Sequence, residues 1–327
     1  MAKDNTEQKW DKIIIVTGGA GFIGSNFLNT VVSRYPNELF INVDSLTYAA
    51  DVGNLSVADA PNYRFAQVDI RDTHALKSLF DQYAPTHVIN FAAESHVDNS
   101  ITGPTVFIET NVVGTHNLLD LSHKRGVKRF HQISTDEVYG SLSPDDVPTD
   151  EEAALRPNSP YSASKTSADL IVRSYHKTYA LDTVITRASN NYGPNQHLEK
   201  LIPLFITRLL QDKKVPLYGS GRNVRDWIYV DDHVEGIDKV FREGKSGEIY
   251  NLGGGMELEN IEIVHMLLVF AGKDESMIEY VKDRPGHDIR YALDSNKATK
   301  ALGWSPKITL EEGLARTFAF YKSHKIN

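Results

Sequence analysis

The chain is predicted to be an α/β protein whose main part is a doubly wound parallel sheet, with a smaller, mostly C-terminal domain beside it. Two observations support this fold class. Short β-branched runs alternate with stretches of helical period through the first half of the chain, which is typical of βαβ units. The first of these runs leads directly into a glycine-rich turn and a helix, as in Rossmann-like sheets.

The first strand and its turn predict a dinucleotide site. Residues 13–16 are a continuous β-branched run, as expected of a strand buried on both faces. The turn TGGAGFIG follows at residues 17–24, and a helix continues to about Tyr35. Its glycines permit close backbone approach to a pyrophosphate, and the helix N-terminus supplies N–H donors. The expected contacts from this turn are Gly18, Gly21, Phe22, Ile23 and Gly24.

Asp44 predicts which dinucleotide binds. It ends the second expected strand, residues 39–43, and lies twenty residues after Gly24. A carboxylate at this place accepts hydrogen bonds from both ribose hydroxyls and repels a 2′-phosphate, so we expect NAD rather than NADP. The alternative is that Asp44 is only a turn residue before Ser45.

Later strands are expected to contribute further cofactor contacts at their ends. A third strand, residues 63–68, ends at Asp69 and Ile70, which would flank the adenine. A fourth strand, residues 87–91, is followed by Ala92, Ala93, Glu94 and Ser95, whose small members let the backbone approach the cofactor.

An acidic pair follows the next strand. Thr135, Asp136 and Glu137 come just after the apolar segment 127–133, at the carboxyl end of a strand, where open α/β sheets bind ligands. The pair is a candidate for acid and base catalysis. The alternative is a solvated turn or a helix cap.

Tyr161 and Lys165 form a second candidate pair. They are four residues apart at the start of a helix expected over residues 164–180, so both face one side. An ammonium beside a phenol favours the phenolate and lowers its pKa towards neutrality, which makes Tyr161 a candidate base. Chance spacing is the alternative for the pair taken alone.

The pattern changes after about residue 190. We expect residues 1–190 and 228–253 to form the NAD-binding domain, and residues 191–227 and 254–327 to form the second domain. Two loops of the second domain carry cations in an otherwise acidic chain, which indicates a local anion site; a solvated surface is the alternative. These side chains are Arg222, Arg225, Arg284, His287 and Arg290.

Composition excludes several classes of protein. The chain has no Cys, which rules out disulfides and thiolate sites. It has no run of 18 apolar residues and no secretory signal, so a cytoplasmic location without a membrane span is the default. The formal net charge of −8 argues against broad nucleic-acid binding. His96 and Asp98 are interpreted as residues that orient a loop rather than as a catalytic or metal pair, and no metal site is predicted.

A homodimer is expected through two helices, residues 105–125 and 164–180, which would form a four-helix bundle with their copies. Both helices carry more apolar residues than one core face needs. Examples are Val112, Leu118, Leu119, Leu170 and Ile171.

The motifs taken together resemble a known family. The glycine turn, the Tyr161/Lys165 pair and the segment NNYGP at residues 190–194 resemble the extended short-chain dehydrogenase/reductases that act on nucleotide sugars. Within that family, five further segments are similar to the dTDP-glucose 4,6-dehydratases. These are TDEVYG (135–140), DSLTYA (44–49), AAESHVD (92–98), GRNVRDW (221–227) and DRPGHD (283–288).

The resemblance implies a mechanism in which NAD oxidises C4 of dTDP-glucose so that the C5 hydrogen becomes acidic. Tyr161 would take the 4-OH proton, with Thr135 hydrogen-bonded to O4. Glu137 would then remove the C5 proton, and Asp136 would protonate the departing C6 hydroxyl. Hydride return to C6 gives a 4-keto-6-deoxy sugar. Asp136 must stay protonated near neutral pH, which burial beside Glu137 favours.

The resemblance also implies two sets of binding residues. Besides the positions above, the cofactor would contact Leu46, Thr47, Phe91, Thr110, Asn191 and Lys165. The nucleotide sugar would contact Ser95, Thr135, Asn190, Lys200, Leu201, Pro216, Tyr218, Arg225, Asn260, Arg284, His287 and Tyr291.

Two departures from the family pattern are visible. Ala50-Asp51 stands where the family usually has Gly-Asn, and Ile289 stands where it often has Arg. The second departure removes one cation near the expected nucleotide site.

Rival interpretations remain at this point. The Asp136-Glu137 pair argues against a nucleotide-sugar 4-epimerase or decarboxylase of the same superfamily. Another 4,6-dehydratase is also an alternative, and it would differ only in the nucleotide sugar that it uses. A non-catalytic NAD-binding regulator is weighed against by the Tyr161/Lys165 pair.

Overall fold

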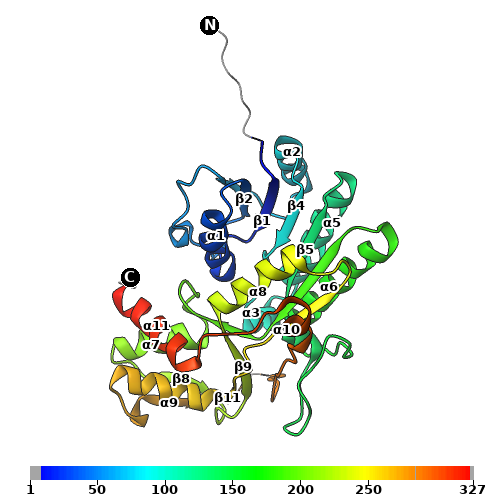
Figure 1. Cartoon of the computed structure of the whole chain (residues 1–327). Helices are drawn as coiled ribbons and strands as arrows, with labels where there is room; N and C mark the ends of the chain where they lie inside the picture. Colours follow the sequence, from blue (N-terminus) through cyan, green and yellow to red (C-terminus); the bar gives the residue numbers. More distant parts are fainter. Residues whose placement is uncertain (1–8, 284, 325–327) are drawn as a thin grey trace.

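A seven-stranded sheet, parallel throughout, forms the main layer of the computed structural model, which describes residues 9–283 and 285–324 (Figure 1). The strand order is β10-β6-β5-β4-β1-β2-β3, so the chain reverses its direction of travel between β1 and β4. The predicted doubly wound fold is confirmed. Its strands are β1 (Lys12–Thr17), β2 (Glu38–Asp44), β3 (Tyr63–Gln67), β4 (His87–Asn90), β5 (Arg129–Thr135), β6 (Thr183–Ala188) and β10 (Ile249–Leu252).

Successive apolar side chains of each strand point to opposite faces of the sheet, so both faces are apolar and both are covered by helices. Ile14 and Val16 of β1 join a core with α1 and α8, whereas Ile15 joins a core with α2, α5 and α6 on the other face. The helices are α1 (Phe22–Arg34), α8 (Val230–Glu243) and α10 (Asn296–Leu302) on the first face, and α2 (Thr73–Tyr83), α5 (Thr115–Lys124) and α6 (Pro160–Tyr179) on the second.

A separate apolar core lies around the C-terminal helices, which gather below the sheet in Figure 1. It contains side chains from α7 (Leu201–Leu210), α9 (Asn260–Ala271) and α11 (Leu310–Ser323). Two small sheets belong to this region: the parallel pair β12 (Ile278–Val281) with β8 (Val215–Tyr218), and β11 (Glu257–Glu259), β9 (Val224–Tyr229) and β7 (Asn190–Tyr192). The domain boundaries given above stay a proposal for how the chain divides between these cores.

The helix expected over residues 105–125 is not one regular helix. It consists of α4 (Thr105–Phe107), a π-helical segment η2 (Ile108–Gly114) and α5. The π-helical segment carries Asn111, whose side chain bonds Glu94 N and O and the Ser164 hydroxyl, so that tertiary contacts override the simple helical period.

Three other boundaries differ from the predictions. Helix α6 begins at Pro160 rather than Ser164, because Ser159 and Ser162 form a capping box before it. Residues 190–192, whose polar composition suits a turn, form β7, and residues 224–226, in one of the two loops expected to carry cations, form the start of β9. These two strands pair with each other in parallel, a long-range contact that a turn-like sequence does not reveal.

Short helical elements complete the fold. They are α3 (Val97–Thr102), η1 (Val52–Asn54), η3 (Asp136–Tyr139) and η4 (Glu275–Met277). None of the helices in the described ranges has the length and apolar character that crossing a membrane requires.

Part of the basis for the expected dimer face is wrong. Leu118 and Leu119 are fully buried in the core of their own chain, so neither is available to a partner. Leu170 is about half exposed, and Ile108 and Val113 of the π-helical segment are also exposed.

Candidate active site

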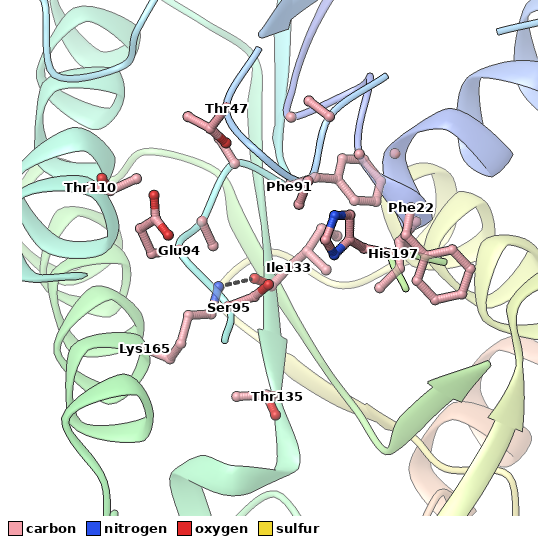
Figure 2. Close-up of a pocket in the computed structure, with 18 of the residues that line it drawn as sticks. Phe22, Thr47, Phe91, Glu94, Ser95, Thr110, Ile133, Thr135, Lys165 and His197 are labelled. Atoms are coloured by element: carbon pink, nitrogen blue, oxygen red, sulfur yellow. Dashed lines mark hydrogen bonds between the residues drawn. The ribbon is translucent and has the colours of Figure 1, made fainter. Parts of the chain in front are cut away.

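A deep cleft runs along the carboxyl edge of the seven-stranded sheet. It holds about 1660 Å³ of empty space, counted together with the open solvent at its mouth. Segments far apart in the sequence line it: the glycine turn, the ends of β2, β3, β4, β5 and β6, helix α6 and residues 188–200. Figure 2 shows Phe22, Phe91, Thr135 and Lys165 around this cavity.

The glycine turn has no room for side chains. Gly18 has φ +68°, and a Cβ there would lie 2.6 Å from Ala92 N. A Cβ on Gly24 would lie 2.3 Å from Gly18 O. Helix α1 starts after Gly21, which has no side chain to cap it, so its first N–H groups are left for an anion. These features fit a dinucleotide pyrophosphate.

Asp44 ends β2 at the wall of the cleft. Its Oδ2 accepts from Ala20 N at 2.9 Å and its Oδ1 accepts from Leu46 N at 2.8 Å, which holds the carboxylate against the glycine turn. Burial raises the pKa of Asp44, although these two backbone bonds oppose the shift. Ser45 and Thr47 line the cleft beside it, whereas Leu46 does not.

The remaining expected cofactor contacts also lie at the cleft wall. Asp69 pairs with Arg71 at 2.6 Å, and the guanidinium hydrogen bond lowers the pKa of the Asp69 carboxyl. The other predicted residues that line the cleft are Ile70, Phe91, Ala92, Ala93, Ser95, Thr110, Tyr161, Lys165 and Asn191. The residues present therefore fit NAD along one continuous wall.

Asp136 is a buried carboxyl at the floor of the cleft. It is 4% exposed, accepts from the Thr135 hydroxyl at 3.1 Å, and its Oδ2 has no partner among the described residues. Burial raises the pKa of Asp136 well above its usual value, and the neighbouring charge of Glu137 raises it further. The expectation of a protonated Asp136 thus agrees with its surroundings.

Tyr161 does not have the depressed pKa that was expected from Lys165. Burial raises the pKa of the Tyr161 phenol, and the charge of the neighbouring Glu137 raises it further. The Lys165 ammonium donates to Ile133 O at 2.7 Å (Figure 2), and burial lowers the pKa of Lys165 to about 8. The physical reason for the difference is that burial of the phenol and its acidic neighbours raise the pKa of Tyr161 more than the Lys165 ammonium lowers it.

The predicted sugar-binding residues fall into two groups. Ser95, Thr135, Asn190 and Lys200 line the cleft, and the Lys200 ammonium donates to Ser95 O at 3.0 Å. The others lie outside the lining of the cleft, and Arg284 lies outside the described residues. The outer group is Leu201, Pro216, Tyr218, Arg225, Asn260, His287 and Tyr291.

Arg225 and Tyr291 form the centre of the outer group. Arg225 is buried, its guanidinium lies 4.5 Å from the Tyr291 ring centroid, and it donates to Asp288 O at 3.0 Å. The Tyr291 hydroxyl in turn donates to the Asp288 carboxylate. This arrangement fixes residues 288–291 against β9.

The expected anion site is only partly assembled. Arg290 pairs with Glu257 and also donates to Ser143 O and Asp146 O, so its charge is already matched. Arg222 is exposed. Of the four proposed cations that the structure describes, Arg225 and His287 lie beside other predicted sugar-binding residues: the Arg225 guanidinium lies over the Tyr291 ring, and the ring centroids of His287 and Tyr218 are 6.3 Å apart.

His96 and Asp98 make one local and one long-range contact. His96 caps α3 by accepting from Asn99 N at 3.2 Å, whereas Asp98 accepts from the distant Tyr218 hydroxyl at 3.2 Å. Their interpretation as residues that orient a loop stays a prediction. No cluster of potential metal ligands occurs within residues 9–283 and 285–324.

Several cleft residues were missed at the sequence level. Glu94, His197 and Glu199 line the cleft, and Glu199 lies 3.7 Å from both His96 and His197. Gln196 and His233 also line it. The position of Glu199 next to the predicted Lys200 was the one available signal; the others depend on which loops meet in space.

Comparisons with known proteins agree with this geometry. Residues 15–317 match the family model described as GDP-mannose 4,6 dehydratase. A Streptomyces griseus protein named dTDP-glucose 4,6-dehydratase is 49% identical over 315 residues, covering 95% of this chain and 94% of the relative. An Escherichia coli K12 protein, dTDP-glucose 4,6-dehydratase 1, is 47% identical and covers 95% and 93%.

A solved structure resembles the whole chain. It is that of DesIV, a dTDP-glucose 4,6-dehydratase from Streptomyces venezuelae, described with NAD and TYD bound. The match has a TM-score of 0.92 and 49% identity, and it covers 96% of this chain and 98% of DesIV.

Proposed function

This chain belongs to the family described as GDP-mannose 4,6 dehydratase, and we propose that it converts dTDP-glucose to dTDP-4-keto-6-deoxyglucose with NAD as cofactor. The observation that carries the proposal is the position of Asp136 and Glu137 beside Tyr161, on the floor of a cleft whose far wall fits a dinucleotide. A simple dehydrogenase or epimerase site needs the tyrosine but has no use for a neighbouring acid and base.

The chemistry explains why a redox site serves a dehydration. The C5 hydrogen of glucose is not acidic until C4 is a ketone, so water cannot leave across C5 and C6 directly. NAD, when bound, supplies a reversible hydride acceptor that is regenerated within each turnover. The chain's own residues must therefore manage four proton transfers: from O4, from C5, to O6, and back to C5 as hydride returns to C6.

Tyr161 is the proposed base for the 4-OH. Burial and the nearby charge of Glu137 hold the pKa of its phenol above the usual value, so the phenol stays protonated until further positive charge is brought nearby. The Lys165 ammonium and the pyridinium ring of NAD are the sources of that charge in our proposal. Thr135 is proposed to hydrogen-bond O4 as the proton leaves.

Asp136 and Glu137 are the proposed acid and base for elimination. Asp136 has the properties of a buried acid that keeps its proton near neutral pH, and it would deliver that proton to the departing C6 hydroxyl. Glu137 would remove the C5 proton. Two adjacent carboxyls in unlike environments support this division, because the charge of Glu137 raises the pKa of the buried Asp136.

The sugar nucleotide is proposed to bind along the outer group of residues. Arg225, Tyr291 and His287 would meet the nucleotide diphosphate and base, while Asn190 and Lys200 would meet the sugar end. Anchoring the nucleotide far from C4, C5 and C6 holds each carbon at its own catalyst.

We also propose a homodimer and a cytoplasmic location. The exposed apolar side chains Ile108, Val113, Leu170 and Tyr179 on adjacent segments η2 and α6 support a subunit contact there. Light scattering at working concentration tests it; a fully active monomer would contradict it.

The function itself is tested by product analysis. Purified protein is incubated with NAD and either dTDP-glucose or UDP-glucose, and the 4-keto product is followed by its absorbance in alkali and by mass spectrometry, with Asp136→Asn as control. We expect loss of one water from dTDP-glucose and little reaction of UDP-glucose. A product of unchanged mass would identify an epimerase, and preference for UDP-glucose would correct the substrate.

A further inference from the structure

His233 is a buried side chain at the cleft with one ring nitrogen unaccounted for. It lies in the first turn of α8, is 0% exposed as a residue, and still lines the cleft. Its Nδ1 lies 2.7 Å from the Asn191 side-chain oxygen, whereas its Nε2 has no hydrogen-bond partner among the described residues. A buried polar atom in this state costs stability unless a ligand satisfies it.

The hydrogen bonds around Asn191 determine which kind of partner Nε2 needs. The Asn191 amide nitrogen donates to Ser189 O at 2.9 Å, and since a carbonyl only accepts, the orientation of the amide follows. Its oxygen therefore faces His233, and Nδ1 must be the protonated ring nitrogen. Burial lowers the pKa of His233 to about 3, so Nε2 is a bare acceptor that requires a donor.

The position of His233 in the cleft selects the part of a dinucleotide that reaches it. Asp44 ends β2, towards one edge of the sheet, while Ser189 and Asn191 follow β6, on the other side of the switch between β1 and β4. A dinucleotide with its adenosine ribose at Asp44 therefore brings its nicotinamide to the β5–β6 side. Lys165 and Tyr161 approach this end from α6, and His233 approaches it from α8, on the opposite face of the sheet.

We propose that His233 is a specificity residue for the cofactor, whose Nε2 accepts a hydrogen bond from the carboxamide NH2 of the nicotinamide, with Asn191 fixing the ring for that purpose. This inference rests on the proposed use of NAD. The carboxamide is the donor that projects from the pyridine ring itself, while the ribose hydroxyls lie behind the ring towards its sugar. A hydroxyl of the hexose is the other possible donor, and the test separates the two.

The test measures equilibrium binding rather than activity. The full-length protein, freed of nucleotide, is titrated by calorimetry with NAD, with 3-acetylpyridine adenine dinucleotide and with ADP-ribose. The acetylpyridine analogue replaces the carboxamide NH2 by a methyl group, and ADP-ribose lacks the pyridine ring. We expect wild-type protein to bind NAD about tenfold more tightly than the acetylpyridine analogue, since the analogue leaves the buried acceptor unpaired.

Two matched variants separate ligand contact from structural support. His233→Asn retains a donor near Nδ1 for Asn191 but removes the acceptor at Nε2, so the preference for NAD over the analogue should fall to about twofold or less. His233→Gln loses the Asn191 contact but places an amide oxygen near Nε2, so it should retain most of the preference. A purely structural role predicts the reverse order.

Binding of ADP-ribose should be the same in all three proteins, which shows that the adenosine end is intact. The inference is overturned if wild-type protein binds NAD but does not distinguish it from the analogue, or if His233→Asn keeps the full preference. In the first case a hexose hydroxyl becomes the donor to test, by repeating the titration with the nucleotide sugar. Failure of wild-type protein to bind NAD at all would instead overturn the proposed function.

Discussion

The two sides of the cleft are built on different principles. The cofactor side, residues 17–24 and the ends of β2, β3 and β4, comes from one stretch of chain and presents mainly backbone, small side chains and one fixed carboxylate. The side that we propose for the nucleotide sugar, called the sugar side below, comes from residues 188–200, β9 and residues 285–291, and presents large side chains held by one another. The catalytic floor lies between them.

Because of this difference, the two sides should be sensitive to different substitutions. On the cofactor side, a methyl group added at Gly18 or Gly24 would collide with backbone atoms, so such a substitution should weaken cofactor binding. The sugar side depends on networks such as Arg225, Tyr291 and Asp288, where removing a donor leaves buried acceptors unpaired. Substitutions should therefore separate cofactor affinity from substrate affinity.

The largest effects are expected on the floor between the two sides. Tyr161→Phe removes the proposed base for O4, so turnover should fall about 10²- to 10⁴-fold and no reduced nicotinamide should form. Glu137→Gln should reduce overall turnover by a similar factor but leave C4 oxidation intact, because the proposed roles of Glu137 begin after it. Absorbance of reduced nicotinamide after mixing with dTDP-glucose distinguishes the two.

Asp136→Asn is the companion to Glu137→Gln and should also accumulate reduced nicotinamide. If Glu137→Gln remains folded and binds cofactor but gives no such signal, Glu137 acts in oxidation or binding, and the division of the floor between two half-reactions is wrong.

The next largest effect concerns the cofactor side and has a matched control. Gly18 and Gly126 both have φ +68°, but a Cβ at Gly18 would meet Ala92 backbone at 2.6 Å, whereas nothing lies within 4 Å at Gly126. Gly126→Ala should cost about 1 kcal/mol from backbone strain alone and leave NAD affinity unchanged. Gly18→Ala should cost more than that and weaken NAD binding at least tenfold.

Calorimetric titration with NAD and thermal unfolding measure both quantities. If the two alanine variants lost equal amounts of stability and of NAD affinity, the turn at Gly18 would relax easily. The close packing of its backbone would then contribute little to NAD binding.

A pH dependence is expected from Asp226 of β9, which accepts from Met256 N at 2.9 Å and Gly254 N at 3.1 Å. Burial raises the pKa of Asp226 to about 6. Between its unfolded value near 4 and about 6, the folded state binds the extra proton, so this group's contribution to stability falls as pH rises through that window. The loss is at most about 3 kcal/mol for two units.

Asp226→Asn removes this titration. The free energy of unfolding of the variant relative to wild type should therefore increase by about 2 kcal/mol or more between pH 4 and pH 6.5, measured in urea at several pH values. Asp59→Asn on the surface serves as the reference. A variant curve parallel to that of wild type would show that folding does not shift the pKa of Asp226.

Arg225→Lys should affect the sugar side alone. A lysine cannot stack on Tyr291 and reach Asp288 O together, so the loop and the proposed nucleotide contact are both weakened. We expect KM for dTDP-glucose to rise about tenfold while the Kd for NAD stays within twofold. Arg222→Lys, an exposed neighbour, is the control. If Arg225→Lys also weakened NAD binding, the two sides would not contribute independently to cofactor and substrate affinity.

The same contrast explains what was predictable from the sequence. The glycine turn and Asp44 were placed correctly because their function follows from local backbone geometry and from spacing along one βα unit. The positions of Thr135 and Asp136 followed equally from the end of a strand. Their confirmed location at the cleft needed no knowledge of distant segments.

The rest depended on contacts that local patterns do not encode. Residues 190–192 have a turn-like composition, yet they form β7 because β9 lies beside them. The pKa of Tyr161 is raised rather than lowered because burial and the nearby carboxyls outweigh Lys165, and burial depends on the whole fold. His233 was missed for the same reason, since nothing in its helix marks it as a residue of the cleft.

The smallest expected effect concerns residue 289, where this chain has Ile instead of the Arg that the family often has. Ile289 is 56% exposed, its backbone is held by Ser141 and Val224, and its side chain is therefore free to be exchanged without loss of those bonds. Ile289→Arg adds a charge beside the loop proposed to meet the nucleotide diphosphate. Exposed charges are worth at most about 1 kcal/mol, so KM for dTDP-glucose should fall no more than about fivefold. The gain should shrink in 0.5 M salt, where screening acts over a few ångströms, whereas Ile289→Gln should show no gain at either salt concentration. A KM for the arginine variant that equals that of the glutamine variant at low salt would place the diphosphate away from residue 289, and the sugar side would then need Arg225 and His287 alone.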